Sequence, residues 1–135
     1  MTRLLRSETI PVRTERDLLL IRQLVRERAT ELSFSGLDLT KLMTAASELG
    51  RNMIIHGGGG TVLIEILATD ERRGVRLTFA DHGPGIADLE QALIDGFTTK
   101  GGLGLGLPGS KRLVNEFEVV SRVGEGTRVT VTRWT

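Results

Sequence analysis

Three short stretches contain residue types that could bind a nucleotide and act on it. In "ELGRN", Glu48 and Asn52 stand four residues apart, so a carboxylate and an amide share one face of a helix. In "DHGPGI", Asp81 opens a turn whose glycines would let a flat ligand approach the backbone closely. In "GLGLPG", which starts at Gly104, glycines precede a predicted helix whose N-terminal N–H groups favour anions. Each stretch alone also fits an ordinary explanation: an exposed polar pair, a Gly-Pro turn or a surface loop.

The glycine-rich stretch "GFTTKGGLGLGLPGSKRL" has six glycines among the fourteen residues from Gly96 to Gly109. "GLGLPG" matches G-x-G-x-x-G, but no strand precedes it and a hairpin follows it, which argues against a dinucleotide-binding unit. Ser110 and Lys111 stand in the reverse of the P-loop order, which argues against that motif too. Leucines alternate with the glycines, unlike in a flexible linker. A lid that clamps phosphate with backbone amides is favoured, with a flexible surface loop as the alternative.

Apolar periodicity and turn residues predict the elements that must position these stretches. Helices are expected from Thr14 to about Leu32, from Asp38 or Thr40 to the glycine run 57–60, over 87–95, and from 104–107 to about Asn115. Strands are expected at 7–13, 61–68, 75–81, 117–123 and 127–134, the first at an edge because of Pro11. Two hairpins demand an antiparallel or mixed sheet. The sequence therefore predicts one α+β domain over residues 1–135, a two-layer α/β sandwich with a mostly antiparallel sheet covered on one face by helices.

The composition excludes several classes of function. The net charge is +1, which gives no electrostatic footprint for nucleic acid or for an anionic membrane. The chain has no cysteine, which excludes disulfides, thiolate metal sites and a cysteine nucleophile. The N-terminal stretch lacks the apolar core of a signal peptide, and no apolar run is long enough to span a membrane. We therefore expect a cytoplasmic protein with neither nucleic acid nor membrane as a partner.

Taken together and in this order, the stretches resemble the ATP-binding signature of the GHKL superfamily of gyrase, Hsp90, histidine kinases and MutL. "ELGRN" resembles the N box, "DHGPGI" the G1 box, "GLGLGL" the G2 box, and "GEGTRVTV" the final box with its threonine. The resemblance covers about residues 38–135 and implies the Bergerat sandwich, in agreement with the predicted element order. No helices with a phosphoacceptor histidine precede this region. The chain therefore resembles the switch-protein serine kinases and anti-sigma-factor kinases, and most of all the stressosome switch kinases.

The resemblance implies roles for the matched residues. Glu48 would be the catalytic base for a substrate serine, and Asn52 would give its amide oxygen to Mg²⁺ on the phosphates of ATP. Asp81 would accept a hydrogen bond from the adenine amino group, and Thr127 would support that contact. The other ATP-binding residues are expected to be Gly83, Gly85 and Ile86 around the adenine, and Thr98, Lys100, Gly101, Gly102, Leu103, Gly104, Leu105 and Gly106 in the lid. The roles of Arg51 and Lys100 stay open between phosphate contact and another surface role.

The resemblance also implies partners. The expected function is an ATP- and Mg²⁺-dependent serine protein kinase that phosphorylates a STAS-domain protein in a partner-switching pathway. A second partner would be either a PP2C-type phosphatase, activated by the released kinase, or a sigma factor. Two alternatives remain at this point: an anti-sigma factor of the same fold that sequesters a sigma subunit, and a nucleotide-binding module without catalysis.

Overall fold

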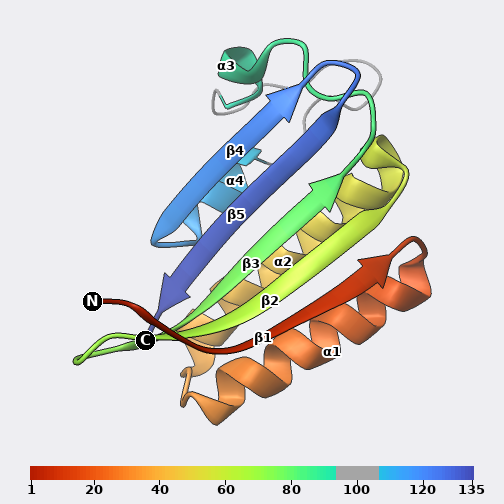
Figure 1. Cartoon of the computed structure of the whole chain (residues 1–135). Coiled ribbons are helices and arrows are strands. Elements are labelled where there is room, and N and C mark those ends of the chain that lie inside the picture. Colours follow the sequence, from red (N-terminus) through yellow and green to blue (C-terminus); the bar gives the residue numbers. More distant parts are fainter. Residues whose placement is uncertain (94–106) are drawn as a thin grey trace.

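One antiparallel sheet forms a complete layer of the fold (Figure 1). The computed structural model describes residues 1–93 and 107–135. The strands are β1 (Arg3–Val12), β2 (Gly60–Ala68), β3 (Arg73–Asp81), β4 (Glu116–Arg122) and β5 (Gly126–Trp134). Their spatial order is β1-β2-β3-β5-β4, and every pairing is antiparallel. The predicted α+β sandwich and both predicted hairpins, β2–β3 and β4–β5, are therefore confirmed, and β1 lies at the predicted edge.

Two long helices cover one face of this sheet (Figure 1). They are α1 (Glu15–Glu31) and α2 (Gly36–Gly57), and two short helices follow, α3 (Leu89–Ala92) and α4 (Leu107–Arg112). Helix α1 begins at the predicted cap: the Thr14 hydroxyl accepts from the Asp17 amide, and the Asp17 carboxylate accepts from the Thr14 amide. No helix in the described part of the chain is both long and apolar enough to cross a membrane.

The boundaries of four elements differ most from the prediction. Strand β1 begins at Arg3, four residues before the predicted start. These first residues were not predicted because a register shift between Leu4 and Arg6 interrupts the regular pattern of the strand. Helix α2 begins at Gly36, after Ser35, although glycine is a poor helix former. Helix α3 covers only 89–92, and α4 ends at Arg112 rather than near Asn115.

The core lies between the sheet and the two long helices and is almost entirely aliphatic. Alternate strand residues such as Ile64, Leu77 and Val131 face the helices and are fully or almost fully buried. The predicted apolar stripe of α2 meets them, with Leu42, Ala46, Leu49 and Met53 all buried. Each buried leucine, isoleucine, valine or methionine side chain contributes about 1.5–3 kcal/mol on leaving water. This packing fixes α2 against the sheet and therefore fixes where its polar residues emerge.

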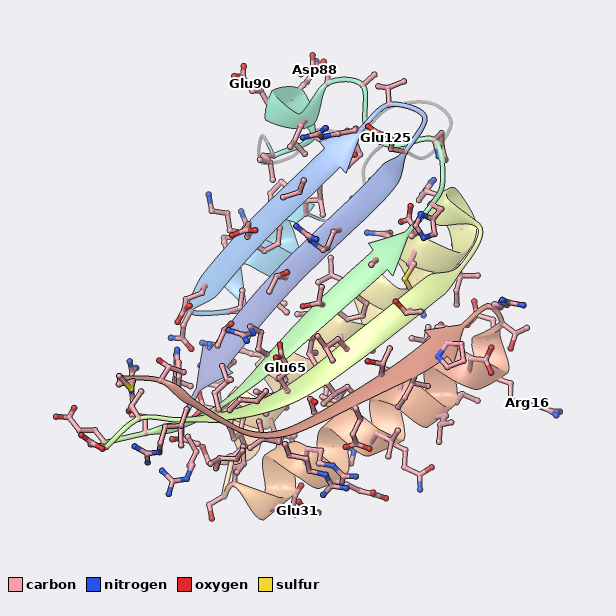
Figure 2. All side chains as sticks on the ribbon, viewed as in Figure 1. Arg16, Glu31, Glu65, Asp88, Glu90 and Glu125 are labelled. Atoms are coloured by element: carbon pink, nitrogen blue, oxygen red, sulfur yellow. The ribbon has the colours of Figure 1, made fainter. Side chains whose placement is uncertain are left out.

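The other face of the sheet carries polar and charged residues. Glu65 on β2 and Arg76 on β3 are direct cross-strand partners and form a two-pronged ion pair, with distances of 2.8 and 3.1 Å between nitrogen and oxygen. Figure 2 shows Glu65 at the middle of this face. Such a pair fixes the register of the two strands, because the two residues meet in one register only. The register in turn places Asp81, the last residue of β3, opposite Gly60 at the start of β2.

Candidate nucleotide-binding site

Asp81 is held by the backbone at the end of β3. Its Oδ1 atom accepts hydrogen bonds from the backbone N–H of Gly83, at 2.9 Å, and of Thr127, at 3.2 Å. Among residues 1–93 and 107–135, no donor contacts its second oxygen, Oδ2. A half-buried carboxylate oxygen without a donor is the acceptor that an amino group of a ligand would need. The predicted role of Asp81 as an acceptor for adenine is therefore compatible with its surroundings.

Glycines let the end of α2 and the start of β5 approach Asp81 closely. A Cβ atom on Gly57, at the end of α2, would lie 2.4 Å from the Asp81 carboxyl carbon, so only glycine lets the helix end so close to this side chain. Gly126 has a φ of +119°, and a Cβ atom there would lie 2.1 Å from the Asp81 carbonyl oxygen. Gly85 has a φ of +76°, in the left-handed region that favours glycine. The turn "DHGPGI" is thus tied to both α2 and β5.

These segments enclose one pocket with a cavity of about 120 Å³. Five of the predicted site residues line it, from α2, β3, the turn after β3, and β5. The complete lining in the described part of the chain is Asn52, His56, Gly57, Asp81, Pro84, Gly85, Ile86, Leu107, Thr127 and Val129. An apolar cavity with a few convergent polar groups is the usual form of a site for a flat heteroaromatic ligand.

A chain of hydroxyls fixes the wall of this pocket. The Ser121 hydroxyl accepts from the Ile86 backbone N–H at 2.8 Å and lies 2.8 Å from the Thr127 hydroxyl. Ser121 also donates to the backbone carbonyl of Gly126 at 3.3 Å. Thr127 therefore touches the site twice, through its amide to Asp81 and through its hydroxyl to Ser121. This gives the predicted supporting role of Thr127 a physical basis.

Gly83 contributes through its backbone and does not line the cavity. Its amide donates to Asp81, and a Cβ atom on it would lie 2.7 Å from the Gly57 Cα atom. The turn and the end of α2 are therefore in close contact at this glycine. The predicted role of Gly83 in admitting the adenine ring stays a prediction.

Glu48 lies outside this pocket. One turn of α2 separates it from Asn52, and its side chain is 46% exposed, with an oxygen 3.4 Å from the Arg51 guanidinium. It lines a neighbouring groove between α1 and α2 instead. Asn52 and Glu48 thus share a helix face as predicted, but only Asn52 reaches the cavity. The catalytic role of Glu48 stays a prediction, and Arg51 acquires a partner that the sequence did not indicate.

The predicted lid lies outside the described residues. Thr98, Lys100, Gly101, Gly102, Leu103, Gly104, Leu105 and Gly106 all belong to the segment 94–106. The first described residue after it, Leu107, begins α4, is 2% exposed and contributes an apolar wall to the pocket. The predicted ATP contacts of the lid residues stay predictions.

Several pocket residues were missed by the sequence reasoning. Gly57 was taken only as a helix stop, and Ser121 only as a strand residue. His56 also lines the pocket without having been predicted, although it follows Asn52 by four residues and so shares its helix face. Val129 could have been found from strand alternation, because it stands two residues after Thr127 on the same side of β5.

Within the described residues, no group of three or more histidine, aspartate or glutamate side chains could hold a metal ion. A divalent cation at this pocket would therefore rely on Asn52 and on oxygens of the ligand itself. Mg²⁺ tolerates such a site, because it keeps several waters and commonly takes few protein ligands beside substrate phosphates. The donor set is compatible with magnesium held mainly by a triphosphate.

The apolar pocket between α2 and the end of β3, with an aspartate held by the backbone amides of Gly83 and Thr127, has the form of a nucleotide site in an α/β sandwich. The chain belongs to the family of histidine kinase-, DNA gyrase B- and HSP90-like ATPases, whose model matches residues 37–134. All the pocket residues described above lie within the matched region. The family predicted from the three stretches is confirmed, and the chain uses ATP.

Among curated proteins, the chain is 43% identical to the serine/threonine-protein kinase RsbT of Bacillus subtilis over 125 residues, which cover 93% of this chain and 94% of that one. It is 38% identical over 99 residues to the anti-sigma F factor of Anoxybacillus flavithermus, covering 68% of this chain and 66% of that one. The chain is thus an enzyme of the serine/threonine protein kinase class.

Solved structures share the fold. The crystal structure of the RsbU and RsbW domains of Rv1364c from Mycobacterium tuberculosis matches 96% of this chain with a TM-score of 0.63 at 20% identity. This chain spans 32% of that solved chain. The SiaB–SiaC complex from Pseudomonas aeruginosa matches 98% of this chain and 91% of that one, with a TM-score of 0.55 at 13% identity. At these identities the likeness establishes the sandwich fold alone.

Proposed function

We propose that this protein is an ATP- and Mg²⁺-dependent serine kinase that phosphorylates a STAS-domain antagonist in a partner-switching pathway. The observation that carries the proposal is the pocket in which Asp81 and Asn52 meet where α2 and β3 end. The similarity to RsbT along nearly the whole chain supports the serine kinase activity. In this proposal the second partner is a PP2C-type phosphatase, which the kinase activates when it leaves the antagonist.

In this proposal, different pocket residues bind the adenine and the phosphates of ATP. The donor-free Oδ2 of Asp81 accepts from the adenine amino group, which selects adenine over guanine. Ile86, Leu107 and Val129 provide apolar walls for the ring. Asn52 lies on the helix turn next to Glu48 and would hold Mg²⁺ by its amide oxygen. The cation neutralises charge on the phosphates when it is bound.

Glu48 would act at the phosphoryl transfer itself. The serine hydroxyl oxygen attacks the γ-phosphorus, the bond from that phosphorus to the bridging oxygen breaks, and ADP leaves. Glu48 takes the proton that the serine hydroxyl loses. Its 46% exposure suits this role, because a protein substrate must reach it from outside the pocket.

The test is phosphate transfer from γ-labelled ATP to purified STAS-domain proteins of the same organism, with Glu48→Gln as the variant. We expect the variant to lose transfer by about 100-fold or more, since general-base catalysis contributes about 10²–10⁴-fold, and to bind ATP as the parent chain does. Arg51→Gln is the matched control, because it removes only the ion-pair partner of Glu48. Undiminished transfer by Glu48→Gln would remove Glu48 from the mechanism, and a parent chain that transfers to no STAS protein would overturn the proposed function.

A second candidate function is an anti-sigma factor that sequesters a sigma subunit. The similarity to anti-sigma F factors over 99 residues favours it. A pull-down of purified sigma subunits by this chain, with ADP and with ATP, distinguishes the two functions. Stable nucleotide-dependent capture of a sigma subunit without transfer to a STAS protein would favour the second.

A further inference from the structure

A groove runs between α1 and α2 on the outer side of the helix layer, with a volume of about 330 Å³. It shares no lining residue with the nucleotide pocket. Its polar lining comes from two turns of α1 and three of α2: Arg22, Arg26, Thr40, Thr44, Ser47 and Glu48. The groove therefore starts at the proposed catalytic base and leads away from the nucleotide.

Two arginines supply the positive charge of this groove. Arg22 and Arg26 stand four residues apart on α1 and so project from the same helix face. Both are exposed, and neither forms a hydrogen bond or ion pair with any residue in 1–93 or 107–135. Arg28 on the same helix behaves differently, since it binds Glu8 at 2.6 Å and is buried. The two groove arginines are therefore available to a partner.

Two hydroxyl groups of the groove already donate hydrogen bonds within α2. The Thr44 hydroxyl donates to the Thr40 carbonyl, and the Ser47 hydroxyl donates to the Met43 carbonyl, each at 2.8 Å. Arg51 lies beside Glu48 and offsets its negative charge. The two free guanidinium groups are thus the strongest recognition elements of the groove, and carboxylates are their preferred ligands, because both can form two-pronged hydrogen bonds.

We propose that this groove binds an acidic segment of the protein substrate, next to the serine that receives the phosphate. The inference rests on the proposed function, because it takes Glu48 as the point at which that serine arrives. Aspartate or glutamate side chains of the segment lie against Arg22 and Arg26, and this contact aligns the serine hydroxyl with Glu48 and the nucleotide pocket. The arginines are positioning residues that select the substrate and take no part in the transfer.

The experiment compares three double variants of the full chain. Arg22→Glu with Arg26→Glu reverses the groove charge, and Arg22→Lys with Arg26→Lys keeps it. Arg122→Glu with Arg128→Glu is the matched control, because these arginines are also exposed and unpaired within the described residues but belong to β4 and β5. The substrates are the purified STAS-domain proteins of the same organism. Transfer kinetics, ATP affinity, and STAS binding with a non-hydrolysable ATP analogue are measured for each.

We expect the groove reversal to raise the KM for the STAS protein about tenfold or more, to leave kcat within about twofold, and to weaken STAS binding in parallel. ATP affinity stays unchanged, the lysine variant recovers most of the loss, and the strand control behaves as the parent chain. An unchanged KM and unchanged binding in the groove reversal overturn the inference, as does an equal loss in the strand control. If the parent chain binds the STAS protein through the arginines but transfers no phosphate, the proposed function is overturned and the proposed role of the groove stands. If the parent chain neither binds nor phosphorylates the STAS protein, both proposals are overturned.

Discussion

Asp81 uses one oxygen for the protein and leaves the other without a donor in the described part of the chain. Oδ1 binds two backbone amides, and both come from segments that follow Asp81 in the sequence, the turn at Gly83 and the strand at Thr127. The carboxylate therefore joins three parts of the fold while keeping Oδ2 for a ligand. Its orientation is set by backbone groups, so substitutions elsewhere on the surface should not disturb it.

Asp81→Asn tests whether Oδ1 holds the fold while Oδ2 binds the ligand. The amide oxygen can still accept from Gly83 and Thr127, so the fold should persist, but an NH₂ group would replace the acceptor Oδ2. Two donors would then face each other at the adenine amino group, and we expect ATP affinity to fall by about 100-fold or more. Isothermal titration calorimetry measures the affinity, and circular dichroism checks the fold. Unchanged affinity would show that Asp81 does not bind the nucleotide.

Gly57→Ala tests the close approach of α2. The added Cβ atom would lie 2.4 Å from the Asp81 carboxyl carbon, so the carboxylate or the helix end must move. We expect a loss of ATP affinity of about tenfold or more, with a decrease in melting temperature. Gly36→Ala is the matched control, because a Cβ atom at the other end of the same helix meets nothing within 4 Å. If both alanines left ATP binding intact, the contact between Gly57 and Asp81 would not matter for the pocket.

At the scale of elements, an ion pair joins β1 to α1. The Arg28 guanidinium donates to both oxygens of Glu8, at 2.6 and 3.3 Å, and this hydrogen bonding holds the pKa of Glu8 below its ordinary value. The same contact raises the pKa of Arg28. Because the edge strand β1 has only one neighbouring strand, this pair adds a second attachment to the rest of the fold.

Glu8→Gln should therefore destabilise the protein by about 2 kcal/mol at pH 7, the typical value of a hydrogen bond between charged groups. A carboxylate whose pKa is lower in the folded state stabilises the fold above its unfolded pKa, and this stabilisation is lost as the pH falls through the lower, folded pKa. The pH dependence of stability below about pH 4.3 should consequently be weaker in the variant. Urea denaturation at several pH values measures both effects.

Glu27→Gln is the control for this pair. Glu27 lies 3.9 Å from the same arginine and its side chain is 50% exposed, so its loss should cost little. Equal destabilisation by the two glutamines would show that net charge, and not the short contact between Glu8 and Arg28, sets the stability.

The sequence predicted elements well where periodicity and packing agree. The strand at Gly60–Ala68 is rich in β-branched and aliphatic residues, and the strand at Arg73–Asp81 alternates, so their boundaries were predicted within one or two residues. The apolar stripe on α2 has helical spacing, and this helix was predicted as well. The first residues of β1 were missed, because the bulge near Leu4 breaks the alternation. The start of helix α2 is predicted two to four residues too late, because glycine is a poor helix former.

The sequence motifs identified several residues of the candidate site, but they could not show which other residues pack against them. Asn52, Asp81 and Thr127 could be found because each belongs to a recognisable local stretch. Gly57 and Ser121 could not, because their importance arises only when α2 and β4 come to lie against Asp81 and Thr127. The separation of Glu48 from the cavity also depends on how α1 packs beside α2, which local spacing does not encode.

At the scale of the whole molecule, ligand binding should stabilise the entire fold. The pocket is built from α2, β3, α4 and β5, so opening it requires that most of the core separate. ATP with Mg²⁺ at about 100 times its Kd contributes about 2.7 kcal/mol, which corresponds to a rise in melting temperature of about 10 °C. GTP at the same concentration should give little change, because in the proposed site Asp81 would accept from the amino group of adenine, which guanine lacks at that position. Differential scanning fluorimetry measures both, and an equal shift with GTP would contradict the assigned role of Asp81.

Both ends of the chain lie far from the pocket (Figure 1). Arg3 pairs with Ala68 and Trp134 with Gly74, whereas Asp81 lies at the opposite end of the same strands. The eight steps between the nine residues of β3 separate these ends by about 26 Å, at roughly 3.3 Å per residue. A tether attached at either terminus would therefore leave the mouth of the pocket unobstructed. The protein can be anchored to a sensor surface through its terminus, and a partner arriving from solution would still meet an open site.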